Sequence, residues 1–268
     1  MKSILITGST DGIGKLTALK LAKEGHRLFI HGRNTAKLKK AILELKEQSG
    51  NRNISGFIAD FSKLAEVRKM AEQIKSELDS LDILINNAGI FMSTENKTED
   101  GFDIRFSVNY LAPYLLTQEL LPLLKKGQKP RIINLSSAAQ SAVSYKALAG
   151  STYLSVNEAY AQSKLALTMW SFHLAKKESD IQVFAVNPGS LLNTKMAKEA
   201  YGQHWAPAEK GANIIYDLAV SEEFSGQTGK YFNNDKGTAR GHFAQAHPKA
   251  YDPMEIDQLI LSTKTILA

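Results

Sequence analysis

Apolar residues occur in short runs along this chain, and the runs alternate with longer stretches in which apolar residues recur every three or four positions. Runs of about four to eight apolar and β-branched residues predict buried strands, whereas the longer periodic stretches predict amphipathic helices. The expected strands cover residues 2–7, 27–31, 54–59, 81–85, 131–135, 181–186 and 230–232. The expected helices cover residues 15–24, 34–48, 62–77, 98–125, 157–177 and 207–220. This alternation predicts one α/β domain, built on a doubly wound parallel sheet of about seven strands with helices on both faces.

Two longer stretches lack a clear period. Residues 138–157 are small, polar and aromatic, and residues 190–206 carry several apolar and aromatic side chains. Loops of this length inside a compact domain are usually functional. The helix expected over residues 98–125 is interrupted too, by a polar Asn109 and by Pro113.

The composition fits a single globular domain that spans residues 1–268. Of the 268 residues, 43% are hydrophobic and 22% are charged, which allows one large core. The longest dense apolar patch, residues 110–116, is far shorter than the ~18–20 residues of a membrane span. The chain begins directly with a strand-like run and contains no cysteine, so we expect no signal peptide and a cytoplasmic location.

The residue counts exclude several kinds of chemistry. Without cysteine there is no thiolate catalysis and no cysteine-bound metal, and the six histidines lack the paired spacing of a metal site. The net charge of +6 is compatible with nucleic-acid binding, but the lysines are spread among glutamates along the expected helices. That distribution is typical of solvated helix faces, so we expect neither a metal nor a nucleic-acid partner.

The first strand ends in a glycine-rich turn that leads into a helix. A strand, turn and helix of this kind point backbone N–H groups at a phosphate, which favours a Rossmann-type dinucleotide site over a plain βα turn. We expect Gly8 to allow the sharp exit from the strand, Gly12 to let a pyrophosphate approach, and Gly14 to let the helix pack closely. The whole turn consists of Gly8, Ser9, Thr10, Asp11, Gly12, Ile13 and Gly14.

The end of the second expected strand indicates which dinucleotide binds. An acid there binds the adenosine ribose hydroxyls, whereas an arginine attracts a 2′-phosphate. Here the sequence is His31-Gly32-Arg33-Asn34, with no acid. This predicts NADP(H) as the preferred cofactor and NAD(H) as the second choice, with Arg33 on the phosphate; the alternative is an Arg33 that faces solvent.

The helix expected over residues 157–177 carries a tyrosine and a lysine four positions apart, Tyr160 and Lys164. This spacing places both side chains on one helix face, close enough for the ammonium to lower the pKa of the phenol. A tyrosine with a lowered pKa can act as a general acid or base. The pair is therefore a candidate acid/base unit, although such pairs also arise by chance on solvated helices.

Taken together, these residues resemble the short-chain dehydrogenase/reductase family over nearly the whole chain. Its motifs stand here in order: Thr7-Gly8 to Gly14, Asn86 to Gly89, a serine after the fifth strand, Tyr160 with Lys164, and Pro188-Gly189. The resemblance implies an NAD(P)-dependent oxidoreductase built on a Rossmann fold.

The resemblance also implies roles for individual residues. Tyr160 is similar to the family's general acid/base, and Lys164 to the residue that holds the nicotinamide ribose and lowers the tyrosine pKa. Ser137, rather than Ser136, resembles the serine that hydrogen-bonds the substrate oxygen. Asn109 matches the asparagine that interrupts a helix and anchors a water on the proton path, or it is a plain polar break. The further implied cofactor contacts are Asp60, unless it caps the next helix, and Phe61, Asn87, Ala88, Gly89, Pro188 and Gly189.

The chain departs from the family pattern in two places: in the loop after Pro188-Gly189, and in the number of residues between Ser137 and Tyr160. The threonine that commonly follows Pro-Gly and bonds the carboxamide comes about one place late here, as Thr194. The gap from Ser137 to Tyr160 is longer than in the shortest members and is similar to the retinol-dehydrogenase-like and protochlorophyllide-reductase-like branch. A protochlorophyllide reductase itself is disfavoured, since that group relies on a catalytic cysteine and this chain has none.

These features predict an oxidoreductase that transfers hydride between nicotinamide C4 and a carbonyl or alcohol. The loop residues expected to line its pocket are largely apolar, which favours a small to medium lipophilic substrate. A rival hypothesis is a catalytically silent NADP(H)-binding redox sensor or interaction protein. A sugar-nucleotide epimerase or dehydratase would need an acidic second-strand end. The apolar residues 110–124 and 165–174 suggest a homodimer through these helices, unless they face the core.

Overall fold

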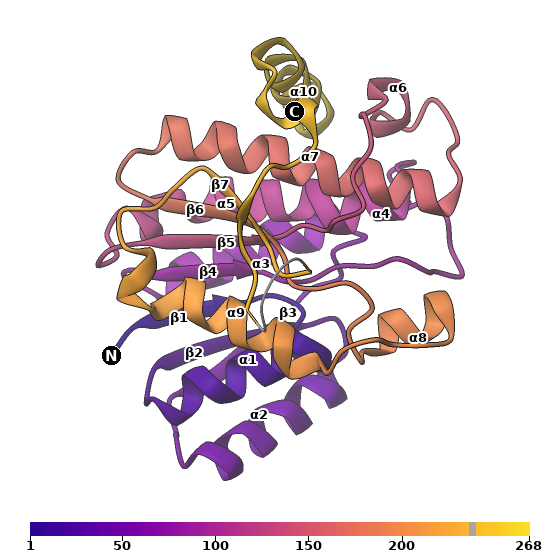
Figure 1. The fold of residues 1–268 in the computed structure, drawn as a ribbon. Helices are drawn as coiled ribbons and strands as arrows, with labels where there is room; N and C mark the ends of the chain where they lie inside the picture. The colour runs from indigo at the N-terminus through magenta and orange to yellow at the C-terminus, as the bar shows by residue number, and fades with distance from the viewer. Residues whose placement is uncertain (236–239) are drawn as a thin grey trace.

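The structure is a computed structural model, which describes residues 1–235 and 240–268. Its centre is an eight-stranded sheet with the order β3-β2-β1-β4-β5-β6-β7-β8 (Figure 1). Strands β1 to β7 are parallel to their neighbours, and β8 is antiparallel to β7. The strands are β1 Ser3–Ile6, β2 Arg27–Gly32, β3 Ile54–Ile58, β4 Ile83–Asn86, β5 Arg131–Leu135, β6 Gln182–Asn187, β7 Lys230–Asn233 and β8 His242–Ala244.

Helices cover both faces of the sheet. One face carries α1 (Gly12–Lys23), α2 (Thr35–Ser49) and α9 (Ala208–Val220), which lie below the sheet in Figure 1. The other face carries α3 (Leu64–Glu77), α5 (Ala112–Leu124) and α7 (Val156–Lys177). Because side chains alternate along a strand, Leu5 enters the second core while Ile4 and Ile6 enter the first. The doubly wound parallel sheet expected from the sequence is confirmed.

The observed elements differ from the predicted ones in their number. The sheet has eight strands rather than about seven, because β8 is too short to stand out in the sequence. The C-terminal helix α10 (Pro253–Leu267) was also missed, and it lies over α7 (Figure 1). Each of the two predicted loops contains a short helix, α6 (Tyr145–Leu148) and α8 (Lys195–Tyr201).

The helix predicted over residues 98–125 was wrong in its first part. Residues 98–103 form a turn closed by a β-bridge between Lys97 and Asp103, and helix begins only at α4 (Ile104–Phe106). A π-helical turn, η1 (Ser107–Leu111), then joins α4 to α5. Two 3₁₀ turns, η2 (Glu222–Phe224) and η3 (Pro248–Tyr251), complete the described helices.

The apolar stretches that suggested a homodimer lie inside the chain. Residues such as Tyr110, Leu165 and Trp170 are fully buried. The Tyr110 hydroxyl forms a buried 2.7 Å hydrogen bond with Thr263 Oγ1 of α10, so α10 closes the outer side of this helical layer. The reading that these residues face the core is therefore the one that the structure supports.

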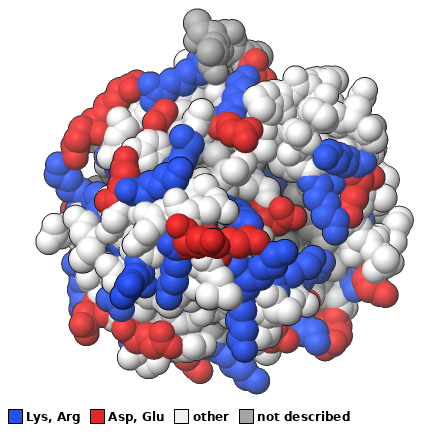
Figure 2. All heavy atoms as spheres, turned by 90° about the horizontal axis from the view of Figure 1, so that it is seen from below, with Lys and Arg blue, Asp and Glu red and all other residues white. Residues whose placement is uncertain are grey.

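The charged surface matches the expectation of solvated helix faces. Figure 2 shows the face seen from below, where lysine and arginine side chains are interspersed with aspartate and glutamate. Elsewhere and on this surface, charges of opposite sign pair: Lys15 with Glu44 between α1 and α2, and Lys75 with Glu119 between α3 and α5. Within residues 1–235 and 240–268 no helix is long and apolar enough to cross a membrane, and no acid or histidine cluster is placed to hold a metal.

Candidate active site

The order of the strands reverses at β1, which lies between β2 and β4. In open α/β sheets, ligands bind at the carboxyl ends of the strands on either side of such a reversal. A cavity of about 380 Å³ lies at this point. It is lined from β1 and α1 by Gly8, Thr10, Asp11, Gly12, Ile13 and Gly14, from β2 and β3 by His31, Gly32, Arg33, Ala59, Asp60 and Phe61, and from β4 by Asn87, Ala88, Gly89, Ile90, Phe91 and Met92. Most of the predicted cofactor residues therefore form one trough.

The three turn glycines differ in backbone conformation and in what surrounds them. Gly8 has a φ of +62°, and a Cβ atom there would lie 2.6 Å from the Ala88 Cα atom. Gly12 also has a positive φ, +56°, but a Cβ there would meet only a Thr194 methyl group at 3.9 Å. Gly12 therefore leaves open space at the N-terminus of α1, where a phosphate group can approach backbone N–H groups.

Gly14 lets α1 pack closely against the segment that directly follows β4. A Cβ at Gly14 would lie 2.4 Å from Asn87 Nδ2. That amide nitrogen donates hydrogen bonds of 2.8 Å to the carbonyl oxygens of both Thr7 and Gly8. The Thr7 hydroxyl in turn accepts from the N–H groups of Asn87 and Ala88 at 3.0 Å. The two motifs, far apart in the sequence, are locked together.

His31 is a site residue that the sequence analysis did not single out. Its Nδ1 atom accepts a 3.1 Å hydrogen bond from the Gly8 N–H, and its Nε2 atom lies 2.9 Å from the Ala59 carbonyl oxygen. Burial lowers the pKa of His31 to about 4, so the ring is neutral near pH 7 and fits the tautomer protonated at Nε2. His31 therefore ties the ends of β1, β2 and β3 together. Its position at the end of β2 was the available signal.

The predicted adenine-side residues lie at the same end of the trough. Phe61 stacks on His31, with 4.3 Å between ring centroids. Arg33 is exposed and lines the trough. The Asp60 carboxylate accepts from the backbone N–H and hydroxyl of Ser62 at 2.9 and 2.8 Å, so it closes a local turn while lining the trough. Ser9 is buried behind the turn, where its hydroxyl donates to the Ile6 carbonyl oxygen.

Lys164 and Tyr160 share one face of α7. A Ser155–Glu158 capping box fixes the first turn of the helix, directly before Tyr160. The Lys164 Nζ atom lies 5.5 Å from the Tyr160 ring centroid and donates a 2.8 Å hydrogen bond to the Leu135 carbonyl oxygen. Burial lowers the pKa of Lys164 to about 7. An amine with this pKa can both give and take a proton near neutral pH.

Asn109 lies in the π-helical turn, which is the helix interruption expected from the sequence. Its Oδ1 atom accepts from the Ile90 N–H at 2.8 Å, and its Nδ2 atom donates to the Ile90 carbonyl oxygen at 3.0 Å. A Cβ at Gly89 would lie 3.3 Å from Asn109 Oδ1 and 3.5 Å from Lys164 Nζ. Gly89 lines the trough, and its lack of a side chain leaves room for Asn109 and Lys164 directly behind it.

The two serines after β5 have different surroundings. The Ser136 hydroxyl is buried and bonds the Lys164 carbonyl oxygen at 3.0 Å and Thr168 Oγ1 at 2.7 Å. Ser137 is only half-buried, and its hydroxyl accepts a 3.1 Å hydrogen bond from the Ala139 N–H. Ser136 therefore holds α7 to β5, which leaves Ser137 as the serine available to a ligand.

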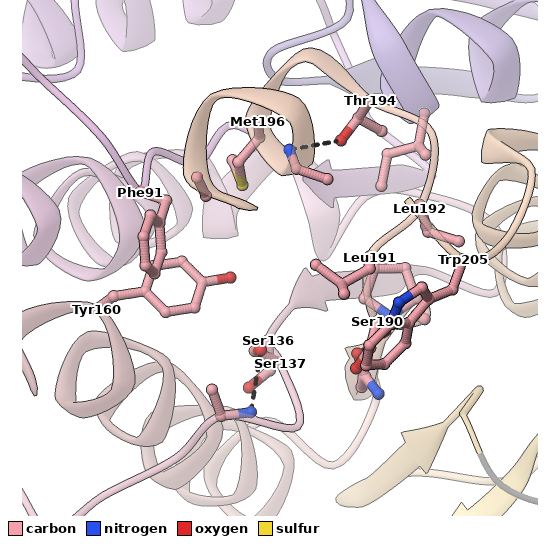
Figure 3. Close-up of a pocket in the computed structure, with 17 residues that line it drawn as sticks. Phe91, Ser136, Ser137, Tyr160, Ser190, Leu191, Leu192, Thr194, Met196 and Trp205 are labelled. Atoms are coloured by element: carbon pink, nitrogen blue, oxygen red, sulfur yellow. Dashed lines mark hydrogen bonds between the residues drawn. The ribbon is translucent and has the colours of Figure 1, made fainter. Parts of the chain in front are cut away.

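A second cavity of about 360 Å³ adjoins the trough and contains Tyr160 and Ser137. Figure 3 shows the Tyr160 hydroxyl pointing into this space, with the two serines on one side and Leu191 across from it. The far wall comes from the loop after β6 and from α8. Its residues are Pro188, Gly189, Ser190, Leu191, Leu192, Met196, Ala197, Ala200 and Trp205.

Thr194 lies between the two cavities and lines both. Its hydroxyl accepts a 3.3 Å hydrogen bond from the Ala197 N–H, which makes it the N-cap of α8. The late position of this threonine therefore has a local structural reason. The expected contact with a carboxamide stays a prediction.

The family model described as short chain dehydrogenase matches residues 2–205 of the chain. The chain belongs to the short-chain dehydrogenase/reductase family. This short-chain dehydrogenase is 34% identical over 263 residues to polyprenol dehydrogenase from Homo sapiens, covering 89% of this chain and 78% of that protein. It is also 34% identical over 250 residues to retinol dehydrogenase 12 from Bos taurus, covering 88% and 79% of the two chains. These relatives confirm the retinol-dehydrogenase-like branch.

A solved structure supports the same assignment. A short-chain dehydrogenase from Escherichia coli CFT073, crystallised with NADPH, superposes on this short-chain dehydrogenase with a TM-score of 0.72 and 26% identity. The match covers 87% of this chain and 95% of that chain. The predicted enzyme class is confirmed: the protein is an oxidoreductase of the short-chain family.

Proposed function

We propose that this protein is an NADP(H)-dependent oxidoreductase that interconverts a carbonyl and an alcohol, with Tyr160 as the general acid/base. The observation that carries the proposal is that Tyr160 and Ser137 line the same cavity, with Lys164 next to the tyrosine ring. Tyr160 points into the second cavity, Lys164 lies beneath it against Gly89, and Ser137 lines the same space. A catalytically silent redox sensor would have no use for this set.

The trough has the features that a dinucleotide requires. The open space above Gly12 and the positive φ angles of Gly8 and Gly12 suit close approach of a pyrophosphate to the backbone. The bound nicotinamide supplies or accepts the hydride. Gly89 lies over Lys164 at the end of the trough that adjoins Tyr160, so the lysine is placed to bind ribose hydroxyls there.

The side chains divide the proton chemistry among them. In the reducing direction the Tyr160 hydroxyl donates a proton to the substrate oxygen, while the Ser137 hydroxyl hydrogen-bonds that oxygen and stabilises the developing charge. Lys164 restores the proton to Tyr160, and its pKa of about 7 suits that exchange at neutral pH. In the oxidising direction the same groups act in reverse.

NADP(H) is the cofactor that the charges favour. Arg33 is exposed at the rim of the trough, directly after β2, where the 2′-phosphate of the adenosine ribose would lie. The related enzyme from Escherichia coli CFT073 was crystallised with NADPH. Asp11 weakens this preference, because it places a carboxylate at the N-terminus of α1, near the expected phosphates. NAD(H) therefore stays the second choice.

The second cavity favours a lipophilic substrate. Its far wall carries Leu191, Leu192, Met196 and Trp205, and the names of the related enzymes refer to retinol and polyprenol. A carbonyl or alcohol at the end of an apolar group is therefore the substrate class that we infer. A cytoplasmic location stays a prediction, which fractionation of expressing cells would check.

The decisive experiment replaces the proton donor alone. Tyr160→Phe removes the hydroxyl and keeps the ring that packs edge-on against Phe91. We expect NADPH-dependent turnover of lipophilic aldehydes and ketones to fall about 10²- to 10⁴-fold, the usual contribution of an acid/base group. NADPH affinity, measured by fluorescence titration, should change less than a few-fold.

The matched control is Tyr153→Phe, because Tyr153 is an exposed tyrosine in the loop before α7. It should keep the parent turnover. A Tyr160→Phe variant that retained more than about a tenth of the parent activity would overturn the acid/base assignment.

A further inference from the structure

The backbone carbonyl of Ser137 is held by two side chains from different parts of the fold. The Tyr231 hydroxyl donates to this carbonyl oxygen at 2.9 Å, and the Gln140 Nε2 atom donates to it at 2.8 Å. Two side-chain donors on one carbonyl indicate that the orientation of this peptide group is controlled.

The Tyr231 hydroxyl is well placed to remain a hydrogen-bond donor to the Ser137 carbonyl. It lies on β7 with 3% of its surface exposed, and β7 is held by β6 on one side and by β8 on the other. Burial raises the pKa of Tyr231, so its hydroxyl keeps its proton at physiological pH and donates to the Ser137 carbonyl. Tyr231 therefore holds the Ser137 carbonyl from β7, a strand that carries none of the proposed catalytic residues.

Gln140 connects the same carbonyl to the C-terminal part of the chain. Its Oε1 atom accepts a 3.2 Å hydrogen bond from the backbone N–H of His247. Residue 247 follows β8 and precedes α10, so the C-terminal segment supports the glutamine that supports Ser137. Tyr231 therefore comes from a distant strand, whereas Gln140 lies in the same loop as Ser137 and is itself held by the C-terminal segment.

The peptide group held in this way is joined directly to the Cα atom that carries the serine hydroxyl. Ser137 lies just past the end of β5, where the strand's hydrogen-bond ladder no longer fixes its backbone. We propose that Tyr231 and Gln140 are positioning residues that aim the Ser137 hydroxyl into the substrate cavity. This inference rests on the proposed function, since it gives the two residues a role only through a catalytic Ser137.

The first test is Tyr231→Phe, which removes the donor and keeps the ring. Losing one of two hydrogen bonds to the carbonyl should lower kcat about 3- to 10-fold, with little change in KM or in NADPH affinity. The control is Tyr145→Phe, because Tyr145 also donates its hydroxyl into the C-terminal region, to Glu255 of α10. The control should lose a similar amount of thermal stability and keep the parent kcat.

A double-mutant cycle separates positioning from a general structural effect. In a Ser137→Ala background, Tyr231→Phe should cause no further loss of kcat, because the group that it positions is absent. Gln140→Met, at a half-buried site, should behave in the same way and provides the test if Tyr231→Phe does not fold.

The outcomes are distinct. An equal loss of kcat in both backgrounds, or a loss no larger than that of Tyr145→Phe, would overturn the positioning role and leave the proposed function intact. If Ser137→Ala alone kept full turnover, the serine would not be catalytic, and both the assignment of Ser137 and this inference would be wrong.

Discussion

His31 shows how one buried side chain can organise the entrance of a nucleotide trough. Its ring joins the Gly8 N–H to the Ala59 carbonyl oxygen and stacks on Phe61, so the ends of three strands meet at one imidazole. The bond from Gly8 needs a neutral Nδ1 atom as its acceptor. Protonation of His31 would remove that acceptor and bury a charge.

The stability of the protein should therefore depend on pH through His31. The folded-state pKa of about 4 lies below the ordinary value of 6.5, so the unfolded chain binds more protons between these values. Stability is complete above pH ~6.5 and is lost as the pH falls, by about 2 kcal/mol between pH 7 and pH 5. Urea unfolding at the two pH values measures this difference.

The variant His31→Asn should be less stable than the parent at pH 7 but should lose less stability on acidification. The control His204→Asn changes an exposed histidine and should keep the parent pH dependence. An unchanged slope in His31→Asn would mean that other groups cause the acid sensitivity.

Arg33 should determine the choice between the two cofactors. A guanidinium that meets the 2′-phosphate contributes about 1.5–3 kcal/mol through charge-assisted bonds, which corresponds to a roughly ten- to hundredfold preference for NADPH. Arg33→Ala should weaken NADPH binding by about this factor and leave NADH binding nearly unchanged.

Fluorescence titration with each cofactor measures this effect. Arg52→Ala, an exposed arginine just before β3, serves as the control for a simple loss of charge. Equal weakening of both cofactors in Arg33→Ala would show that Arg33 does not contact the 2′-phosphate.

At the scale of elements, the helix that carries Tyr160 and Lys164 depends on its first turn. The Ser155 hydroxyl accepts from the Glu158 N–H, and the Glu158 carboxylate accepts from the Ser155 N–H at 3.0 Å. Ser155→Ala should cost about 1 kcal/mol of stability and, by loosening the turn next to Tyr160, should lower kcat as well. Denaturant unfolding and steady-state kinetics measure the two effects.

Ser155→Asp is the matched variant, because aspartate caps helices as well as serine does. It should restore both stability and turnover. If the aspartate variant were as impaired as the alanine variant, the cap would not be the cause.

The sequence predicted those elements that repeat a simple pattern. Seven strands and the long helices followed from apolar periodicity, and the trough residues followed from glycine and small polar motifs at strand ends. It did not predict β8, α10 or the turn before Ile104, since β8 is only 3 residues long and the turn depends on a bridge between Lys97 and Asp103. His31 was missed because a buried neutral histidine has no spacing that marks it.

At the scale of the whole molecule, α10 bears on the state of assembly. The homodimer expected from residues 110–124 and 165–174 is untested, but the apolar side chains of these helices are buried within one chain. A second copy would find little apolar surface there, so we expect a monomer of 29.5 kDa at micromolar concentration. Sedimentation velocity measures this, and a species of twice that mass would show that another face mediates association.

The contacts of the C-terminal segment also determine when during synthesis the enzyme becomes complete. Tyr160 and Lys164 leave the ribosome well before the C-terminal segment that covers their helical layer. The contacts made by that segment are Thr263 with Tyr110, Glu255 with Tyr145 and His247 with Gln140. Each of these contacts spans more than 100 residues, so none can form until the last part of the chain is released. A nascent chain that already contains every proposed catalytic residue would thus still expose an apolar helical layer. We therefore expect folding during translation to depend on chaperones that cover this layer until the closing helix is released.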